Sequence, residues 1–181
     1  MASSVPARQT PRGSAPRIAI IDFEASCLPE YGESFPIEVA LAKLDGSTRS
    51  WLIRMAPEWQ DWDWSDEAEA LHGISRDMLA EYGQPAEQVL RELAAEAAGV
   101  DVYADCDLDA YWLETLAQAC RAPVPFAIRY LGELLAAQKV SRADVVAALD
   151  RAKQLLPEEH VARDDASRLA LTLRLLSRKS A

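Results

Sequence analysis

The segment Ile18-Ala19-Ile20-Ile21-Asp22-Phe23-Glu24-Ala25-Ser26 places two acidic residues in an otherwise largely apolar run, and it constrains the fold more than any other stretch. A run rich in β-branched residues is typical of a buried strand. Alternate residues of a strand share a face, so Asp22 and Glu24 would project together, away from Phe23. Two carboxylates there raise each other's pKa unless a cation neutralises them. Mg²⁺, which takes oxygen ligands, could do so. The alternative is that both acids simply start a loop.

The composition predicts one globular domain with a tail. The chain has 181 residues, half of them hydrophobic. Residues 1–16 contain three prolines and no acidic residue, which predicts a disordered tail before a domain of residues 17–181. No apolar run is long enough for a membrane span or forms a signal peptide, so we expect no membrane partner. Three cysteines without a C-x-x-C pair indicate a reducing compartment, and we expect a cytoplasmic protein. The sequence predicts no particular oligomeric state.

The formal net charge of −10 restricts the partners. Proteins that hold long nucleic acids usually carry a basic surface. Either the partner is not a nucleic acid, or the contact with it is short and local.

The order of predicted elements indicates an α/β fold. Residues 18–26, 37–42 and 50–54 predict a strand meander with a turn at Asp45-Gly46. Further strands are expected at 100–104 and 123–128. Helices are expected at 75–82, 85–99, 130–138, 141–156 and from after His160 to about Ser177, with another after Asp109 whose buried face would be Tyr111, Trp112, Leu113 and Leu116. We therefore predict a mixed five-stranded sheet, an antiparallel meander followed by parallel strands, flanked by helices.

Residues 57–66 carry Trp59, Trp62 and Trp64 among acidic residues. Such aromatics can stack on nucleobases, but they more often pack a loop onto the core, and we favour packing.

Acidic residues recur at three places: Asp22 with Glu24, the segment Asp105 to Asp109, and Asp164 with Asp165. Four carboxylates brought together could hold two divalent ions, the arrangement that assists phosphodiester cleavage. His160 lies near the third cluster, and an imidazole suits proton transfer at neutral pH.

In this order, the motifs resemble those of the DEDDh 3′-to-5′ exonucleases, the family of polymerase proofreading exonucleases and oligoribonuclease. The first motif is matched by Asp22-Phe23-Glu24, the second by Asp109-Ala110-Tyr111-Trp112-Leu113, and the third by residues 160–166 with their H-x-x-x-x-D spacing. Between the first two, Leu71-His72-Gly73-Ile74 resembles the segment that lines the terminal-nucleotide pocket. Together these motifs span residues 18 to about 177.

The resemblance implies a ribonuclease H-like fold and a role for each matched residue. Asp22, Glu24, Asp109 and Asp165 would bind two Mg²⁺ or Mn²⁺ ions, and His160 would be the general base. The terminal nucleotide would lie against Phe23, Ala25, His72, Gly73 and Ile74. Helical periodicity alone would pair His160 with Asp164, four residues on, but this conflict disappears if His160 precedes the helix. We therefore choose Asp165, with Asp164 as the fallback.

The second motif departs from the family pattern. Where the family commonly has His-Asn-Ala before an aromatic residue and the aspartate, this chain has Ala104-Asp105-Cys106, and Leu108 stands in place of the aromatic residue. Asp105 would either tighten metal binding or repel substrate phosphate. A solvated loop acid is the equally good alternative.

The function that the resemblance implies is metal-dependent 3′-to-5′ exonuclease activity on DNA or RNA 3′ ends, releasing nucleoside 5′-monophosphates. The acidic charge favours single strands or short oligonucleotides. The alternative is a non-catalytic nucleic-acid-binding or interaction module on the same fold. A third possibility is a subunit recruited by a larger complex, although no docking motif stands out.

Overall fold

The computed structural model describes residues 17–179, and the predicted tail of residues 1–16 lies outside this range. Five strands form one mixed sheet in the order β3-β2-β1-β4-β5. Their bounds are Ile18–Ala25 (β1), Pro36–Lys43 (β2), Thr48–Leu52 (β3), Asp101–Ala104 (β4) and Ile128–Tyr130 (β5). β1 pairs antiparallel with β2 and parallel with β4, so the predicted meander followed by parallel strands is confirmed.

Two strands differ from their predicted bounds by more than one residue at an end. β5 lies at Ile128–Tyr130, not at 123–128. Pro123 and Pro125 lack the backbone N–H that a sheet ladder needs, so pairing starts only beyond them, at Val102 opposite Ile128. β3 starts at Thr48 because the turn, in which Gly46 takes a φ of 97°, is short and places only residues 44–47 between β2 and β3.

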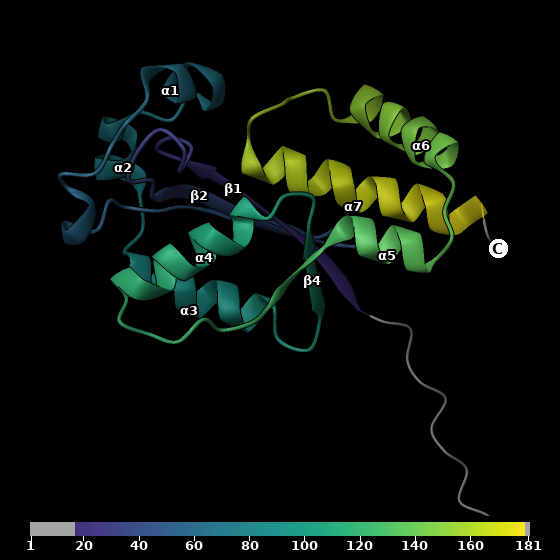
Figure 1. The fold of residues 1–181 in the computed structure, drawn as a ribbon, viewed down its shortest axis with the longest axis horizontal. Coiled ribbons are helices and arrows are strands. Elements are labelled where there is room, and N and C mark those ends of the chain that lie inside the picture. Colours follow the sequence, from purple (N-terminus) through teal and green to yellow (C-terminus); the bar gives the residue numbers. More distant parts are fainter. Residues whose placement is uncertain (1–16, 180–181) are drawn as a thin grey trace, which may run out of the picture.

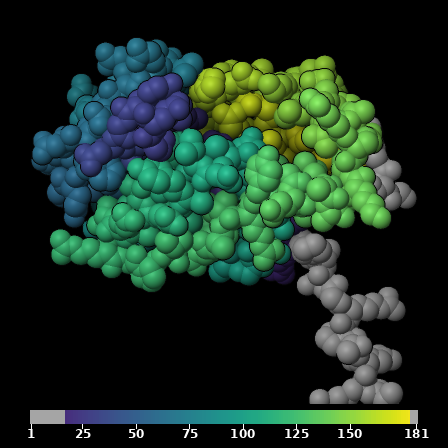
Figure 2. Space-filling model, in the orientation of Figure 1, coloured from purple at the N-terminus to yellow at the C-terminus, as the bar shows by residue number. Residues whose placement is uncertain are grey.

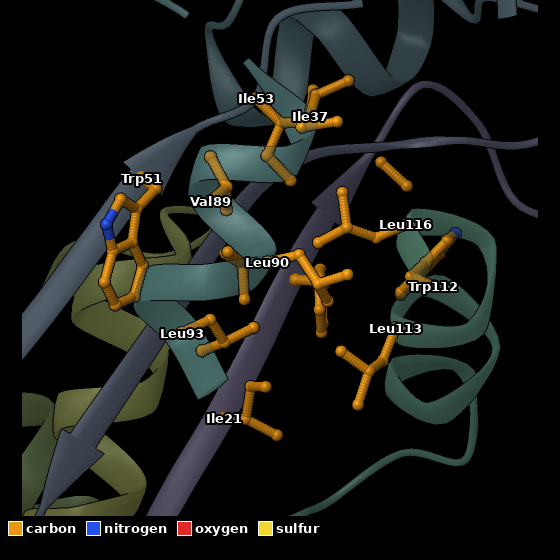
Figure 3. Packing of buried hydrophobic residues seen from close by; sticks show 14 of the residues in the cluster. Ile21, Ile37, Trp51, Ile53, Val89, Leu90, Leu93, Trp112, Leu113 and Leu116 are labelled. Carbon is orange, nitrogen blue, oxygen red and sulfur yellow. The ribbon is translucent and has the colours of Figure 1, made fainter. Parts of the chain in front are cut away.

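Helices cover both faces of the sheet (Figure 1). The helices are α1 (Asp66–His72), α2 (Arg76–Tyr82), α3 (Ala86–Glu96), α4 (Leu108–Ala119), α5 (Leu131–Ala137), α6 (Arg142–Leu155) and α7 (Ala162–Lys179), with a 3₁₀ turn at Pro57–Trp59. The core on one face joins the sheet to α3 and α4 (Figure 3). The second core joins the other face to α5, α6 and α7.

Alternation along β1 decides which face each side chain joins. Ala19, Ile21 and Phe23 pack in the core of α3 and α4. Ile18 and Ile20 pack in the core of α7. Asp22 and Glu24 continue this second series, so the face that carries them is the one that α7 covers.

Helix α1 was not predicted. It is only seven residues long and three of them are acidic, so it has no clear apolar periodicity. Its ends nevertheless carry the usual signals, because the Ser65 side chain accepts a hydrogen bond from Ala68 N and Gly73 closes the helix with a φ of 71°.

The tryptophan-rich segment packs onto the core, as expected. Trp59 is buried and stacks on Phe35 with ring centroids 5.3 Å apart, while Trp62 and Trp64 are partly buried against the same core. Tyr111 was predicted to be buried, and this is wrong. Its side chain lies at the surface, where its hydroxyl donates to Ser34 O at 3.5 Å.

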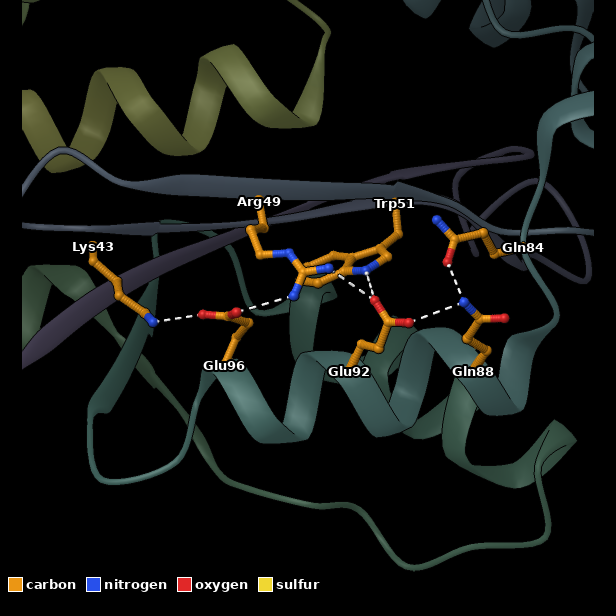
Figure 4. Close-up of polar contacts among 7 residues, drawn as sticks. All are labelled: Lys43, Arg49, Trp51, Gln84, Gln88, Glu92 and Glu96. Atoms are coloured by element: carbon orange, nitrogen blue, oxygen red, sulfur yellow. Dashed lines mark hydrogen bonds and ion pairs between the residues drawn. The ribbon is translucent and has the colours of Figure 1, made fainter.

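Helix α3 is fastened to the edge of the sheet by a polar network (Figure 4). Glu96 accepts from Lys43 at 2.6 Å and from Arg49 at 3.0 Å. Glu92 accepts from Arg49 and from the Trp51 indole. These contacts lie on the side of the sheet away from α7.

Among the described residues, no helix is long and apolar enough to cross a membrane. The three cysteines are free thiols.

Candidate metal centre

Three carboxylates from two distant segments converge at the C-terminal end of β1. Asp22 and Glu24 project from the strand, and Asp165 lies in the first turn of α7. Each offers an oxygen, and these oxygens lie within 4.8 Å of one another. Figure 2 shows the surface above this meeting point, with the loop after β1 in purple beside the start of α7 in yellow.

Asp164, the fallback of the sequence analysis, is not part of this triad. It lines a separate pocket with Ser167 and Arg174. Asp164 N and Asp165 N both donate to Val161 O at 2.9 Å, which places them together in the opening turn of α7. Successive helical residues point about 100° apart, so only one of the two can face β1.

Asp109, on α4, is not one of the three members of this group but lies close enough to repel Asp22 and Glu24. Its side chain is 2% exposed, and Oδ1 accepts a hydrogen bond from Phe23 N at 3.0 Å. The parallel ladder between β1 and β4 ends at Ile20 opposite Tyr103, so Phe23 N lies beyond it and has no strand partner on that side. The carboxylate of Asp109 takes the place of that partner and is thereby held beside Asp22.

Burial and repulsion shift the carboxylates strongly. Burial, then repulsion from Asp109 and Glu24, raises the pKa of Asp22 well above its ordinary value. Burial, then repulsion from Asp165, raises the pKa of Glu24 to about 8. The pKa of Asp109 also rises to about 8, through burial and then repulsion from Asp105. These groups cannot all ionise at neutral pH unless a cation balances them, and an all-carboxylate donor set suits Mg²⁺ or Mn²⁺. The residues therefore fit a divalent ion.

Asp105, which the sequence left undecided, lies in the loop after β4. Its side chain is exposed, yet partial burial, with repulsion from Asp165, raises its pKa. It also contributes to the raised pKa of Asp109. Asp105 thus acts on the cluster from its rim.

His160 precedes α7, as the choice of Asp165 required. It is exposed and has a φ of 60°, a conformation uncommon for a residue with a side chain. Its backbone N–H donates to Asp165 Oδ2 at 2.8 Å. The histidine and the aspartate five residues apart are therefore brought together through the backbone.

His72, Gly73 and Ile74 form the turn at the end of α1. His72 Nδ1 accepts from Ile74 N at 3.0 Å, which assigns the ring proton to Nε2, a buried atom with no hydrogen-bond partner among the described residues. Burial lowers the pKa of His72, the charge of Glu69 and a contact with the Ala25 backbone oppose this, and the charge of His160 adds a smaller lowering. The two imidazoles are therefore within electrostatic reach of each other.

Phe23, Ala25 and Ile74 are buried in the core of α3 and α4. Their side chains are committed to packing, and the backbone N–H groups of Phe23 and Ile74 already donate to Asp109 and His72. Gly73 is exposed, and no atom lies within 4 Å of the position that a Cβ would take.

Sequence reasoning missed two residues that lie against the cluster. Glu38 on β2 stands directly opposite Glu24 and accepts from Ala162 N, at the start of α7, at 3.1 Å. Arg168 on α7 donates to Asp165. The signal for Glu38 was a single acid within an otherwise apolar strand. Arg168 carried a similar signal, a cation between the apolar positions Ala166 and Leu169 of the helix.

No protein-family model matches the chain, and neither does any curated protein sequence. Solved structures do. A full-length 3′-exonuclease matches over 96% of this chain with a TM-score of 0.66 and 21% identity. A 3′-exonuclease solved with a histone mRNA stem-loop covers 92% of this chain at the same TM-score and identity. Exonuclease I of E. coli, in complex with a dA16 oligonucleotide, covers 91% with a TM-score of 0.66 and 10% identity.

The chain spans 64% of the full-length 3′-exonuclease, 84% of the stem-loop-binding one and 41% of exonuclease I. Both the fold class and the resemblance in fold to 3′-exonucleases are confirmed. The protein has the ribonuclease H-like fold of these enzymes, and its carboxylate cluster lies at the end of the first strand.

Proposed function

We propose that the protein is a metal-dependent 3′-to-5′ exonuclease that releases nucleoside 5′-monophosphates from single-stranded or short nucleic acid. The observation that carries the proposal is the convergence of Asp22, Glu24 and Asp165 at one point of an exonuclease fold. A half-buried group of acids is costly to the fold by itself, so its presence calls for a function.

In this proposal Asp22, Glu24, Asp109 and Asp165 hold two divalent ions, Mg²⁺ or Mn²⁺. When bound, such ions supply positive charge that balances the scissile phosphate and the leaving oxygen. Asp109 has a second role, because its hydrogen bond to Phe23 N fixes the end of β1, which carries Asp22 and Glu24.

His160 serves as the general base and takes the proton of the attacking water. An imidazole is suited to this at neutral pH. Its backbone hydrogen bond to Asp165 Oδ2 keeps the base beside the acid cluster. This hydrogen bond fixes His160 relative to Asp165. Since Asp165 would hold an ion that balances the phosphate, it also fixes the base relative to the phosphate.

The substrate end would lie against the turn of His72, Gly73 and Ile74 and the backbone of Phe23 and Ala25. His72 Nε2–H is a buried donor that makes no short hydrogen bond among the described residues, although a contact with the Ala25 backbone raises the pKa of the imidazole. The net charge of −10 suits an enzyme that grips only a few terminal nucleotides. The free thiols suit a reducing, cytoplasmic compartment.

Both RNA and DNA are candidate substrates. One neighbour was solved with a histone mRNA stem-loop and another with dA16. RNA differs from DNA by its 2′-hydroxyl, so matched RNA and DNA oligomers of one sequence should be digested side by side.

The test uses 5′-labelled oligomers with Mg²⁺ or Mn²⁺ and four variants. Wild-type protein is expected to shorten the 3′ end. Asp22→Asn, His160→Ala and Asp165→Asn should lose about 10²-fold or more of the rate, as removal of a metal ligand or a general base does. Asp164→Asn is the matched control and should keep it. Shortening that persists in Asp22→Asn would refute the proposal, and metal-independent binding without shortening would favour a non-catalytic module.

A further inference from the structure

Arg168 is a buried cation whose role the fold does not explain. Its side chain is 7% exposed, although arginine usually keeps its charge in water. All three guanidinium nitrogens donate. Nε donates to Leu156 O at 3.1 Å, Nη2 to Glu158 O and Nη1 to Asp165 Oδ1.

The two carbonyl acceptors lie in the segment that leads to His160. Leu156 closes α6, and Glu158 is two residues before His160. Carbonyl groups at a helix end have no partner within the helix. Arg168 supplies partners from α7, so it fixes the connection between α6 and α7 at two points.

The carboxylate acceptor links the same guanidinium to the proposed site. Asp165 Oδ1 accepts from Arg168, while Oδ2 accepts from His160 N at 2.8 Å. His160 has a φ of 60°, and a residue persists in such a conformation only when its surroundings hold it there. Arg168 therefore contacts the segment that precedes His160 and also Asp165, the residue that accepts the hydrogen bond of His160 N.

We propose that Arg168 is a positioning residue, which holds the segment of residues 156–160 against Asp165 and so sets the place of His160. The inference rests on the proposed function, because the place of His160 matters most if this residue takes a proton. It adds a determinant that none of the three matched motifs contains.

The competing explanation is that Arg168 only supplies positive charge to an acidic site. Lysine would do that equally well. A lysine ammonium is a single point, however, and cannot reach two carbonyls and a carboxylate as a planar guanidinium does. Arg168→Lys therefore separates positioning from charge.

The first measurement needs neither metal nor activity. Amide hydrogen exchange of metal-free protein is compared for wild type, Arg168→Lys, Arg168→Gln and Arg174→Gln. Arg174→Gln is the control, because it removes a charge from the same helix outside this contact. Both Arg168 variants should speed exchange of His160 N–H by about tenfold or more, the sign of local opening, and leave β1 protected. Unchanged exchange in Arg168→Lys would overturn the inference.

A further check uses the wild-type protein alone, so its result does not depend on whether a variant folds. The Nε–H proton of Arg168, bonded to Leu156 O, should exchange with water far more slowly than that of exposed Arg151. Equally fast exchange would overturn the inference.

The second measurement follows kcat, KM and the pH profile on an oligonucleotide. Both Arg168 variants should lose about 10- to 100-fold in kcat, as displaced catalytic groups do, while KM changes by about threefold or less. The limb of the pH profile that His160→Ala removes should be displaced in both variants.

Wild-type kcat in Arg168→Lys would mean that charge alone suffices, and the inference would fail while the proposed function stands. Wild-type protein that shortens no 3′ end would refute the proposed function, and exchange of the His160 amide would still decide whether Arg168 holds the segment.

Discussion

Glu24 on β1 and Glu38 on β2 are directly opposed in the antiparallel ladder, so their side chains share the face beneath α7. Like charges in this arrangement repel. Burial raises the pKa of both, and Glu38 adds to the rise at Glu24. Glu38 differs in having a partner, because Ala162 N donates to it at 3.1 Å. Its carboxylate at the start of α7 also meets the positive end of the helix dipole.

Glu38→Gln should stabilise the metal-free protein. Glutamine keeps an oxygen for Ala162 N and removes the charge that opposes Glu24. Relief of about 1 kcal/mol would raise the melting temperature by about 2–4 °C for a chain of this size. Thermal unfolding in a chelator measures it.

Glu38→Ala is the control, since it removes the charge and the acceptor together. The unpaired Ala162 N–H should cost about 1–3 kcal/mol and lower the melting temperature. Exonuclease activity of Glu38→Gln should stay near that of wild type. Activity as low as that of Asp22→Asn would instead make Glu38 a metal ligand.

Stability of the metal-free protein should fall as pH rises from 7 to 9. The pKa values of Glu24 and Asp109 are about 8 when folded, above their ordinary values, so the folded state binds more protons. The stabilisation that these protonated groups contribute is fully present below the pKa of the unfolded state. It is lost as pH rises through the pKa of the folded state. His72, with a lowered pKa, acts in the opposite sense only below about pH 6.5.

Urea unfolding at pH 7, 8 and 9 in a chelator measures this slope. Glu24→Gln should flatten it, because one of the titrating groups is gone. A stability that rises across the interval would contradict the assigned directions.

Much of the fold was predictable because its signals are local. The alternation in β1 placed Asp22 and Glu24 on one face, and the apolar stripe of Ala162, Ala166 and Leu173 placed the buried side of α7. The turn at Gly46 fixed the meander. Each of these depends on neighbours a few residues away.

The parts that sequence reasoning missed depend on contacts across the fold. The hydrogen bond between Glu38 and Ala162 N joins residues 124 positions apart. Asp109 replaces a strand partner of Phe23 from 86 positions away. No periodicity encodes such contacts. The preference for Asp165 over Asp164 likewise needed the resemblance, since helical spacing from His160 favoured the wrong neighbour for the triad.

Asp105→Asn should leave exonuclease activity within a few fold of wild type, while Asp109→Asn should abolish it. Asp105 is exposed and acts at the rim, whereas Asp109 is buried and hydrogen-bonded to β1. The two changes are chemically identical and four residues apart, so each is the control of the other in a steady-state assay. Equal losses would place Asp105 among the ligands.

Mg²⁺ should raise the melting temperature of the wild-type protein and not that of Asp22→Asn. An ion that binds only the folded state stabilises it by about 2.7 kcal/mol at 100 times its dissociation constant. It also removes the repulsion that raises the pKa of Asp22 and Glu24. Asp164→Asn, one residue from the triad, should respond as wild type does. If Asp22→Asn gains as much as wild type, the end of β1 is not the metal site, whatever activity the protein has.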